Sequence, residues 1–92
     1  MAEQEISDEE IKADLMHRLL RKHCWEAKYL PMDTLVNWVS KKIKGNGKRI
    51  RKCIGELVKE GHIILHKGGR AISLSSMKSR EIAEYIKKVL EI

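Results

Sequence analysis

Hydrophobic residues recur at helical spacing in four stretches of the chain, and these stretches predict four helices. The first opens with the capping box Ser7-Asp8-Glu9-Glu10 and ends near His23. The second begins around 31–33, the third spans 47–60, and the last begins between 76 and 79. The residues expected to face inward are Ile11, Leu15, Met16, Leu19, Leu20, Leu35, Val36, Val39, Ile43, Ile50, Cys53, Ile54, Leu57, Val58, Ile82, Tyr85, Ile86, Val89 and Leu90.

The third helix has the clearest two-sided pattern. Its apolar residues fall at i, i+3, i+4, i+7 and i+8, starting at Ile50, and Gly61 supplies a C-terminal stop. At about 100° per residue, the opposite side carries a row formed by Lys48, Lys52, Gly55 and Lys59. Arg49 and Glu56 are expected on one flank and Arg51 on the other. One side of this helix is therefore predicted to pack, while the other presents cations.

Between the third and last helices, the segment HIILHKGGRAISLS predicts a β-hairpin closed by Gly68-Gly69. This turn pairs His66 with Ala71, Leu65 with Ile72, Ile64 with Ser73 and Ile63 with Leu74. The pairs Leu65/Ile72 and Ile63/Leu74 are expected on the core face, with Lys67 and Arg70 in solvent at the tip. A short edge strand is predicted at 27–30, stopped by Pro31, and Asn46 in the turn 44–47 is a predicted N-cap.

These elements predict a single α+β domain over 1–92, with 1–6 as a flexible tail. No apolar run reaches the roughly 18 residues that cross a bilayer, and the acidic N-terminus does not match a secretory signal. Cys24 and Cys53 are the only cysteines, which favours reduced thiols and a cytoplasmic location with no membrane partner.

Positive charge is concentrated in the segment 41–70. This segment has ten lysines and arginines against Glu56 and Glu60, a net charge of +8, whereas the whole chain carries +6. The first ten residues carry five acids and no base. A folded segment this basic is either a footprint for a polyanion or a solvated surface.

Other chemistries fit the sequence less well. Gly45-Asn46-Gly47-Lys48 follows a helix and lacks the Walker spacing and hydroxyl. The histidines, of which His62 and His66 share a strand face in the register above, do not have the spacing of a metal site. Glu56 and Glu60 are expected to pair with the neighbouring Lys52 and Lys59 rather than form a catalytic pair. The sequence therefore predicts no enzyme, cofactor or metal.

The aromatic residues are few. Trp25, Tyr29, Trp38 and Tyr85 all lie outside the segment 41–70 and are expected in core or half-buried positions. Proteins that bind single strands place aromatic rings among their cations to stack the bases. The absence of aromatics from the basic segment therefore counts against a base-stacking reader.

The order of these elements resembles the winged helix-turn-helix family, over roughly Ser7 to the C-terminus. The resemblance rests on the two-helix unit 35–58 with its Gly45-Asn46-Gly47 turn, on the run Leu-Val-Lys-Glu-Gly-His-Ile-Ile at 57–64, and on the tip 67–70. It implies a three-helix core, a two- or three-stranded antiparallel wing and an additional C-terminal helix. It also implies that helix 47–60 enters the major groove and that the tip contacts the backbone or minor groove of duplex DNA.

Two functions follow from this resemblance. The first is double-stranded DNA binding by a transcription regulator or chromosome-associated protein; the second is a winged-helix module docking on a protein or RNA–protein assembly through apolar residues such as Ile64. The predicted DNA-binding residues are Lys44, Asn46, Lys48, Arg49, Arg51, Lys52, Lys59, Lys67 and Arg70. The outer face of helix 47–60 has no Asn or Gln to read adenine, which favours affinity over sequence selectivity. The last helix packs within the chain or forms a homodimer contact.

Overall fold

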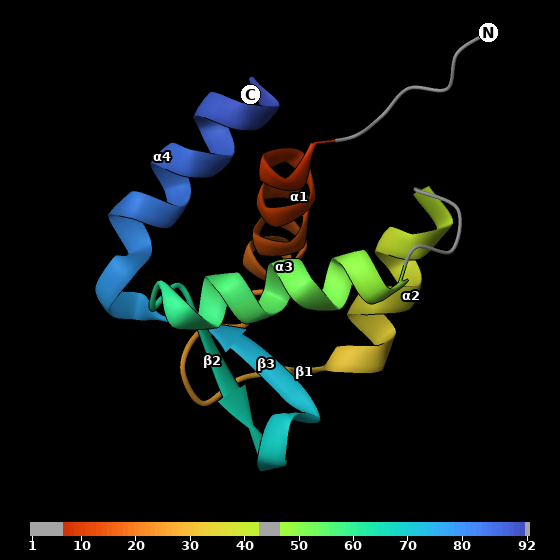
Figure 1. The fold of residues 1–92 in the computed structure, drawn as a ribbon. Helices are drawn as coiled ribbons and strands as arrows, with labels where there is room; N and C mark the ends of the chain where they lie inside the picture. Colours follow the sequence, from red (N-terminus) through yellow and green to blue (C-terminus); the bar gives the residue numbers. More distant parts are fainter. Residues whose placement is uncertain (1–6, 43–46, 92) are drawn as a thin grey trace, which may run out of the picture.

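The computed structural model describes residues 7–42 and 47–91. These residues form an α+β structure with four α-helices and a three-stranded antiparallel sheet (Figure 1). The helices are α1 (Asp8–Arg21), α2 (Met32–Lys42), α3 (Gly47–Lys59) and α4 (Ser79–Leu90), and the strands are β1 (Leu30–Pro31), β2 (Ile63–His66) and β3 (Ala71–Leu74). The predicted tail 1–6, the inward position Ile43 and the predicted site residues Lys44 and Asn46 lie outside the described residues.

Helix α1 begins at the predicted capping box. The Glu10 amide donates to the Ser7 hydroxyl at 3.1 Å, and the Ser7 amide donates to the Glu10 carboxylate at 3.2 Å. These two bonds satisfy amides that have no partner inside the helix. The predicted stripe of α1 lies at the centre of the core, where Ile11, Leu15 and Leu19 are fully buried. Helices α2, α3 and α4 all pack against α1.

Helix α4 packs on α1 within the chain, which confirms the intrachain arrangement expected for its apolar stripe (Figure 1). Ile82 and Ile86 are buried in this contact, and Tyr85 is half-buried, with its hydroxyl 3.5 Å from the Glu9 carbonyl oxygen. No helix among the described residues combines the length and the hydrophobicity needed to cross a bilayer.

The sheet has the strand order β1-β3-β2, and the predicted hairpin register is confirmed at all four pairs. The turn follows from its glycines: Gly68 and Gly69 have φ of 67° and 94°, values that glycine adopts without a Cβ clash. The Arg70 amide donates to the Lys67 carbonyl at 3.3 Å and closes the turn. The predicted edge strand 27–30 is only partly correct, because β1 comprises Leu30–Pro31 and pairs antiparallel with β3.

The predicted core face of the hairpin is wrong at Leu65, whose side chain is 46% exposed. Leu65 lies on β2, at the edge of the sheet, whereas its partner Ile72 lies on the central strand β3 between β1 and β2 and is fully buried. Every residue of β3 is buried, and the segment after α1 bonds to the end of this strand, where the Glu26 amide donates to the Leu74 carbonyl at 2.9 Å. The Ser73 hydroxyl donates to the Glu26 carbonyl at 2.8 Å across this contact.

Candidate nucleic-acid interface

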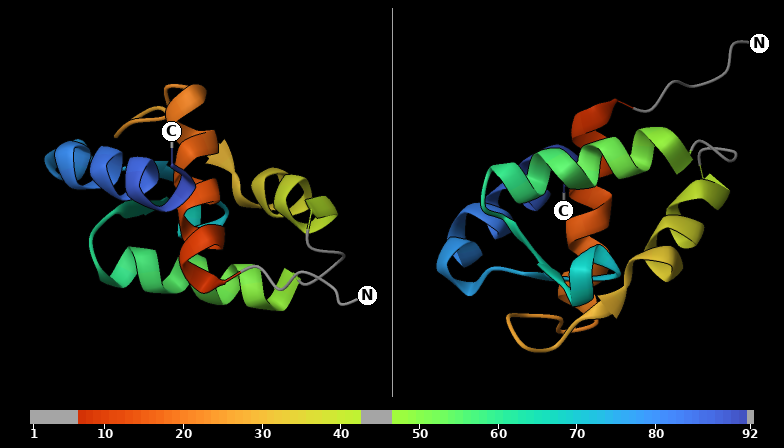
Figure 2. Two further views of the ribbon diagram at one scale, coloured as in Figure 1. Left: turned by 90° about the horizontal axis from the view of Figure 1, so that it is seen from above. Right: turned by 60° about the horizontal axis from the view of Figure 1, so that its bottom comes forward.

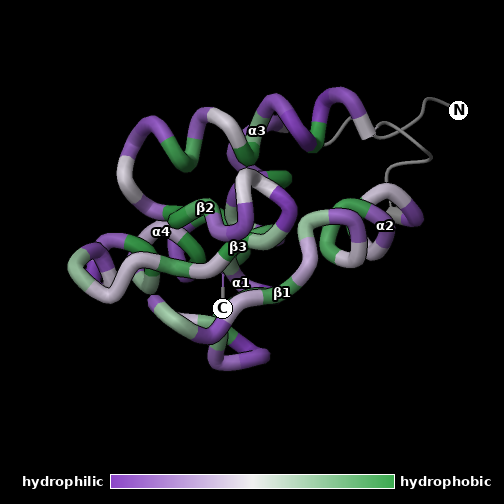
Figure 3. Tube along the Cα trace, turned by 90° about the horizontal axis from the view of Figure 1, so that it is seen from below, coloured by the Kyte–Doolittle hydropathy of each residue, from purple (hydrophilic) through white to green (hydrophobic). Residues whose placement is uncertain are grey.

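Helix α3 separates its two faces as the sequence predicts. Ile50, Ile54 and Leu57 are at most 2% exposed, while all four residues of the opposite row, Lys48, Lys52, Gly55 and Lys59, are exposed. In Figure 3 the helix shows hydrophobic residues toward the body of the molecule and hydrophilic residues along its outer edge. Within the described part of the chain, no ion pair involves Lys48, Lys52 or Lys59. We call these three residues the lysine row.

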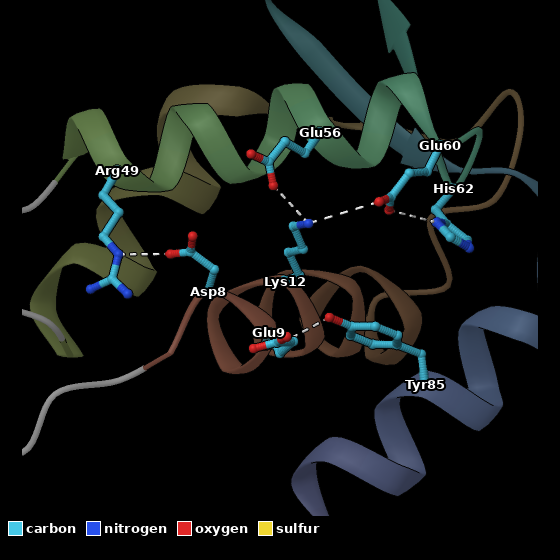
Figure 4. A network of polar contacts seen from close by, with 8 residues as sticks. All are labelled: Asp8, Glu9, Lys12, Arg49, Glu56, Glu60, His62 and Tyr85. Carbon is cyan, nitrogen blue, oxygen red and sulfur yellow. Dashed lines mark hydrogen bonds and ion pairs between the residues drawn. The ribbon is translucent and has the colours of Figure 1, made fainter.

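The two arginines of α3 point toward neighbouring helices. Arg49 Nε donates to Asp8 Oδ1 on α1 at 2.8 Å, and this bond is the main reason that the pKa of Asp8 is lowered (Figure 4). Arg51 Nη2 lies 3.1 Å from Asp33 Oδ1 on α2. Arg49 and Arg51 therefore already bind carboxylates of the protein, and the outer face of α3 is left to the lysine row.

The predicted ion pairs of Glu56 and Glu60 with Lys52 and Lys59 are wrong. Both carboxylates turn toward Lys12 on α1, whose Nζ lies 2.7 Å from Glu56 Oε1 and 3.9 Å from Glu60 Oε2 (Figure 4). The side chain of Lys12 is 14% exposed, and its bond to Glu56 raises its pKa above the usual value. This contact occupies the acids on the inner flank of α3, so neither forms an ion pair with the lysine row.

The hairpin tip presents a second pair of cations, because Lys67 and Arg70 are both exposed. At its base, the ring of Tyr29 stacks on His66 with centroids 4.6 Å apart, and Lys67 Nζ lies 5.6 Å from the centre of the tyrosine ring. His66 Nε2 lies 2.8 Å from the Ser73 hydroxyl, which donates its only hydrogen to Glu26. Nε2 therefore carries the proton and donates to Ser73.

Of the four aromatics, Trp25, Trp38 and Tyr85 are half-buried as predicted, whereas Tyr29 is 37% exposed beside the tip. The sequence separates Tyr29 from the basic segment, but strand β1 follows it directly and brings it next to the hairpin. Ile64, the apolar residue proposed for docking, is half-buried.

The lysine row and the tip are carried by adjacent elements. Strand β2 leaves the C-terminal end of α3, and the hairpin extends away from α1 and α4 toward the bottom of Figure 1. In the right-hand view of Figure 2, α3 and the hairpin tip both face the reader, with α2 beside them. The exposed cations of α3 and of the tip thus belong to two elements that follow each other directly in the fold.

His62 and His66 do not converge on one potential metal site. His62 precedes β2 and lies 3.5 Å from Glu60 and 3.6 Å from Glu81, whereas His66 binds Ser73. The described residues contain no group of three or more His, Cys, Asp or Glu side chains placed to hold a metal ion. Burial raises the pKa of both thiols, that of Cys53 to about 11, so neither is poised as a nucleophile.

A further cationic site lies between α1 and α2 and was not predicted. A shallow pocket of about 340 Å³ is lined by Arg18, Arg21, Lys22 and Trp38. The sequence contained one signal for it, since the three cations are spaced i, i+3 and i+4 near the end of α1. Trp38 follows 16 positions after Lys22, and its placement beside them depends on how α1 and α2 pack.

Comparisons with known proteins identified no relative of this chain. No protein-family model matches the chain, and searches of curated proteins and of solved structures found no match.

Proposed function

We propose that this chain is a winged helix-turn-helix protein that binds double-stranded DNA through α3 and the hairpin tip, as a transcription regulator or chromosome-associated protein. The observation that carries the proposal is the lysine row. Three exposed lysines share one face of a helix and have no internal ion pair among the described residues, while every acid and arginine on the flanks of that helix pairs with another element. A row of exposed lysines without ion-pair partners is suited to an external polyanion.

The order of the elements supports the winged-helix assignment. The chain begins with a helix and a short strand, which are followed by two helices, a hairpin and a final helix. The short strand pairs with the second strand of the hairpin. In this arrangement α2 and α3 form the helix-turn-helix unit, α3 is the recognition helix, and the hairpin is the wing.

The dimensions of α3 suit a major groove. A helix with its side chains is about 10–12 Å across and the groove is about 12 Å wide, so α3 enters with its lysine row toward the phosphates. Lys48 and Lys59 are separated by eleven residues, which at a rise of 1.5 Å per residue is roughly 16 Å along the helix. Lysines at this spacing contact phosphates along the groove rather than one base pair.

The wing adds backbone contacts beyond the groove. Lys67 and Arg70 lie on either side of the Gly68-Gly69 turn and are exposed. Because the two arginines of α3 already pair with Asp8 and Asp33, neither is left to make a fork-shaped contact with guanine unless its pair opens. The proposed complex is therefore bound mainly through phosphates, with weak sequence selectivity.

A matched pair of variants tests this assignment. We expect Lys48→Ala with Lys52→Ala to weaken binding to random-sequence duplex DNA and to reduce the slope of log K against log salt concentration by about 1.8, at about 0.9 per phosphate contact. Lys87→Ala with Lys88→Ala removes the same charge from exposed positions on α4 and should leave the slope unchanged. If both double variants had the same slope, α3 would not be part of the DNA interface.

The second candidate function, docking on a protein, rests on a different observation. Leu65 is 46% exposed on the edge strand β2, which leaves an apolar side chain next to unpaired backbone groups. Under this alternative, Leu65→Ser abolishes capture of the partner and the cation variants do not. Under the DNA assignment, Leu65→Ser leaves the duplex salt slope unchanged.

A further inference from the structure

The pocket between α1 and α2 combines three cations with one aromatic ring. Arg18 and Arg21 come from the C-terminal end of α1, Lys22 is the residue that directly follows it, and Trp38 comes from α2. Lys22 Nζ lies 5.7 Å from the centre of the Trp38 ring, so a cation faces the indole. Trp38 is half-buried against the hydrophobic core, and this packing fixes the ring while leaving part of it accessible.

The charge in this pocket is not cancelled by its surroundings. One carboxylate, Asp14, lies beside it and accepts a hydrogen bond from Arg18 Nε at 3.1 Å. Arg21 and Lys22 are exposed, and within the described residues neither forms an ion pair. A pair of unneutralised cations beside an accessible indole recognises a ligand that has both phosphate groups and planar rings.

We propose that this pocket binds a single-stranded nucleic acid, with Arg21 and Lys22 contacting its phosphates and Trp38 stacking one base. The shape of the pocket favours a strand over a free small molecule. Sites for small molecules are mostly apolar and enclose the greater part of the ligand, whereas this pocket is shallow, lies at the small end of the usual range and has three charged residues among its four. An extended single strand needs to insert only one of its bases into this pocket.

The accessible ring favours a single strand over a second duplex. In a duplex the faces of the bases are covered by their neighbours, so an indole gains little from it, whereas an unpaired base offers its face for stacking. Lys22 covers the ring at 5.7 Å and is exposed. Its flexible stem allows it to leave the ring for a phosphate when a base arrives.

This site is separate from the proposed duplex interface. In the left-hand view of Figure 2, α3 lies along one side of the molecule and the C-terminal end of α1 lies on the opposite side. The lysine row and the pocket therefore do not compete for one ligand. The inference is independent of the proposed function, since the pocket has its own cations and its own aromatic.

Trp38 is a built-in reporter for the test. The chain has two tryptophans, so a Trp25→Phe variant leaves Trp38 as the only fluorescent indole. We expect an oligothymidylate of roughly twelve nucleotides, within the site sizes of single-strand binders, to quench this fluorescence in a saturable manner. Arg21→Ala with Lys22→Ala should weaken this binding and reduce its salt slope by about 1.4, at about 0.7 per contact on a single strand. Trp38→Leu should weaken binding about fivefold or more, measured by anisotropy of a labelled strand.

The matched control is Lys87→Ala with Lys88→Ala, which removes the same charge from exposed positions on α4. It should leave the affinity for oligothymidylate within about twofold, and circular dichroism confirms that each variant is folded. The proposal is overturned if the two double variants weaken oligothymidylate binding equally, or if the oligonucleotide leaves Trp38 fluorescence unchanged. Quenching by duplex DNA but not by oligothymidylate would mean that a second duplex occupies the pocket. Equal affinity for thymidine monophosphate would mean a small-molecule site. Either outcome overturns the single-strand assignment.

Discussion

Substitutions at Gly55 allow the stability of α3 and its proposed role in DNA binding to be tested separately. It lies inside the helix, on the exposed face between Lys52 and Lys59, and a Cβ added there meets no atom within 4 Å. Glycine inside a helix is about 0.8–1.0 kcal/mol less favourable than alanine, because more backbone freedom is lost on folding. With no clash to offset this gain, Gly55→Ala should stabilise the protein by about that amount and raise Tm by roughly 4–8 °C.

A larger side chain at the same position tests why this helix keeps a glycine. Gly55→Gln also improves helix propensity, so we expect a Tm above that of the wild type. If the lysine row faces DNA, however, the glutamine side chain occupies the space where the helix approaches the phosphates. We expect duplex affinity to fall about tenfold, measured by anisotropy of a labelled random duplex. Ala83→Gln, at an exposed position on α4, adds comparable bulk and should leave duplex affinity unchanged.

Two results would contradict these expectations for Gly55. A lower Tm for Gly55→Ala would mean that position 55 is not an unobstructed helical site. A Gly55→Gln variant that is more stable and binds duplex DNA as tightly as the wild type would mean that this face of α3 does not approach DNA.

Three further predictions concern the core and the polar contacts beneath α3. Ile54 is 2% exposed, so Ile54→Ala should lower the free energy of unfolding by about 2–4 kcal/mol in urea titrations; a loss below roughly 0.5 kcal/mol would contradict its burial. Lys12→Met keeps the apolar stem of the side chain but removes the bond to Glu56, and should cost about 1 kcal/mol at neutral pH. Because this bond raises the pKa of Lys12 above 10.5, its stabilisation is full below pH 10.5 and is lost as the pH rises through the folded-state value, so wild type and variant should converge there. Finally, Cys53 is 1% exposed and burial raises its pKa from 9.0 to about 11, so in a Cys24→Ala background a thiol reagent should react at least about 100-fold more slowly with the native protein than with the unfolded chain; equal rates would contradict this.

The local elements were predictable because short stretches of sequence determine them. Spacing alone identified the buried face of α3, and the Ser7 capping box marked the start of α1. The Gly68-Gly69 turn determined the hairpin register, because a two-residue turn leaves one way to align the strands. The same rule did not say which strand is central, and Leu65 was therefore placed in the core.

The polar contacts of the candidate site were less predictable, because they join residues far apart in the sequence. Glu56 was assigned to lysines of its own helix, yet it binds Lys12, 44 positions earlier. Arg49 was expected to face DNA, and its partner Asp8 lies on α1. Helix periodicity gives the direction of a side chain but not the charges that another helix brings opposite it. The pocket around Trp38 was missed for the same reason.

The salt dependence of duplex binding is the decisive measurement for the proposed DNA interface. Binding to a random-sequence duplex is measured over a series of salt concentrations, for the wild type and for a variant in which Lys48, Lys52, Lys67 and Arg70 are all alanine. We expect the wild type to bind with a steep slope, and the variant to lose most of its affinity while its slope flattens by about 3.6, at about 0.9 for each of four phosphate contacts. A variant that is folded, binds as tightly as the wild type and keeps its slope would contradict the assignment of α3 and the hairpin tip as the DNA interface.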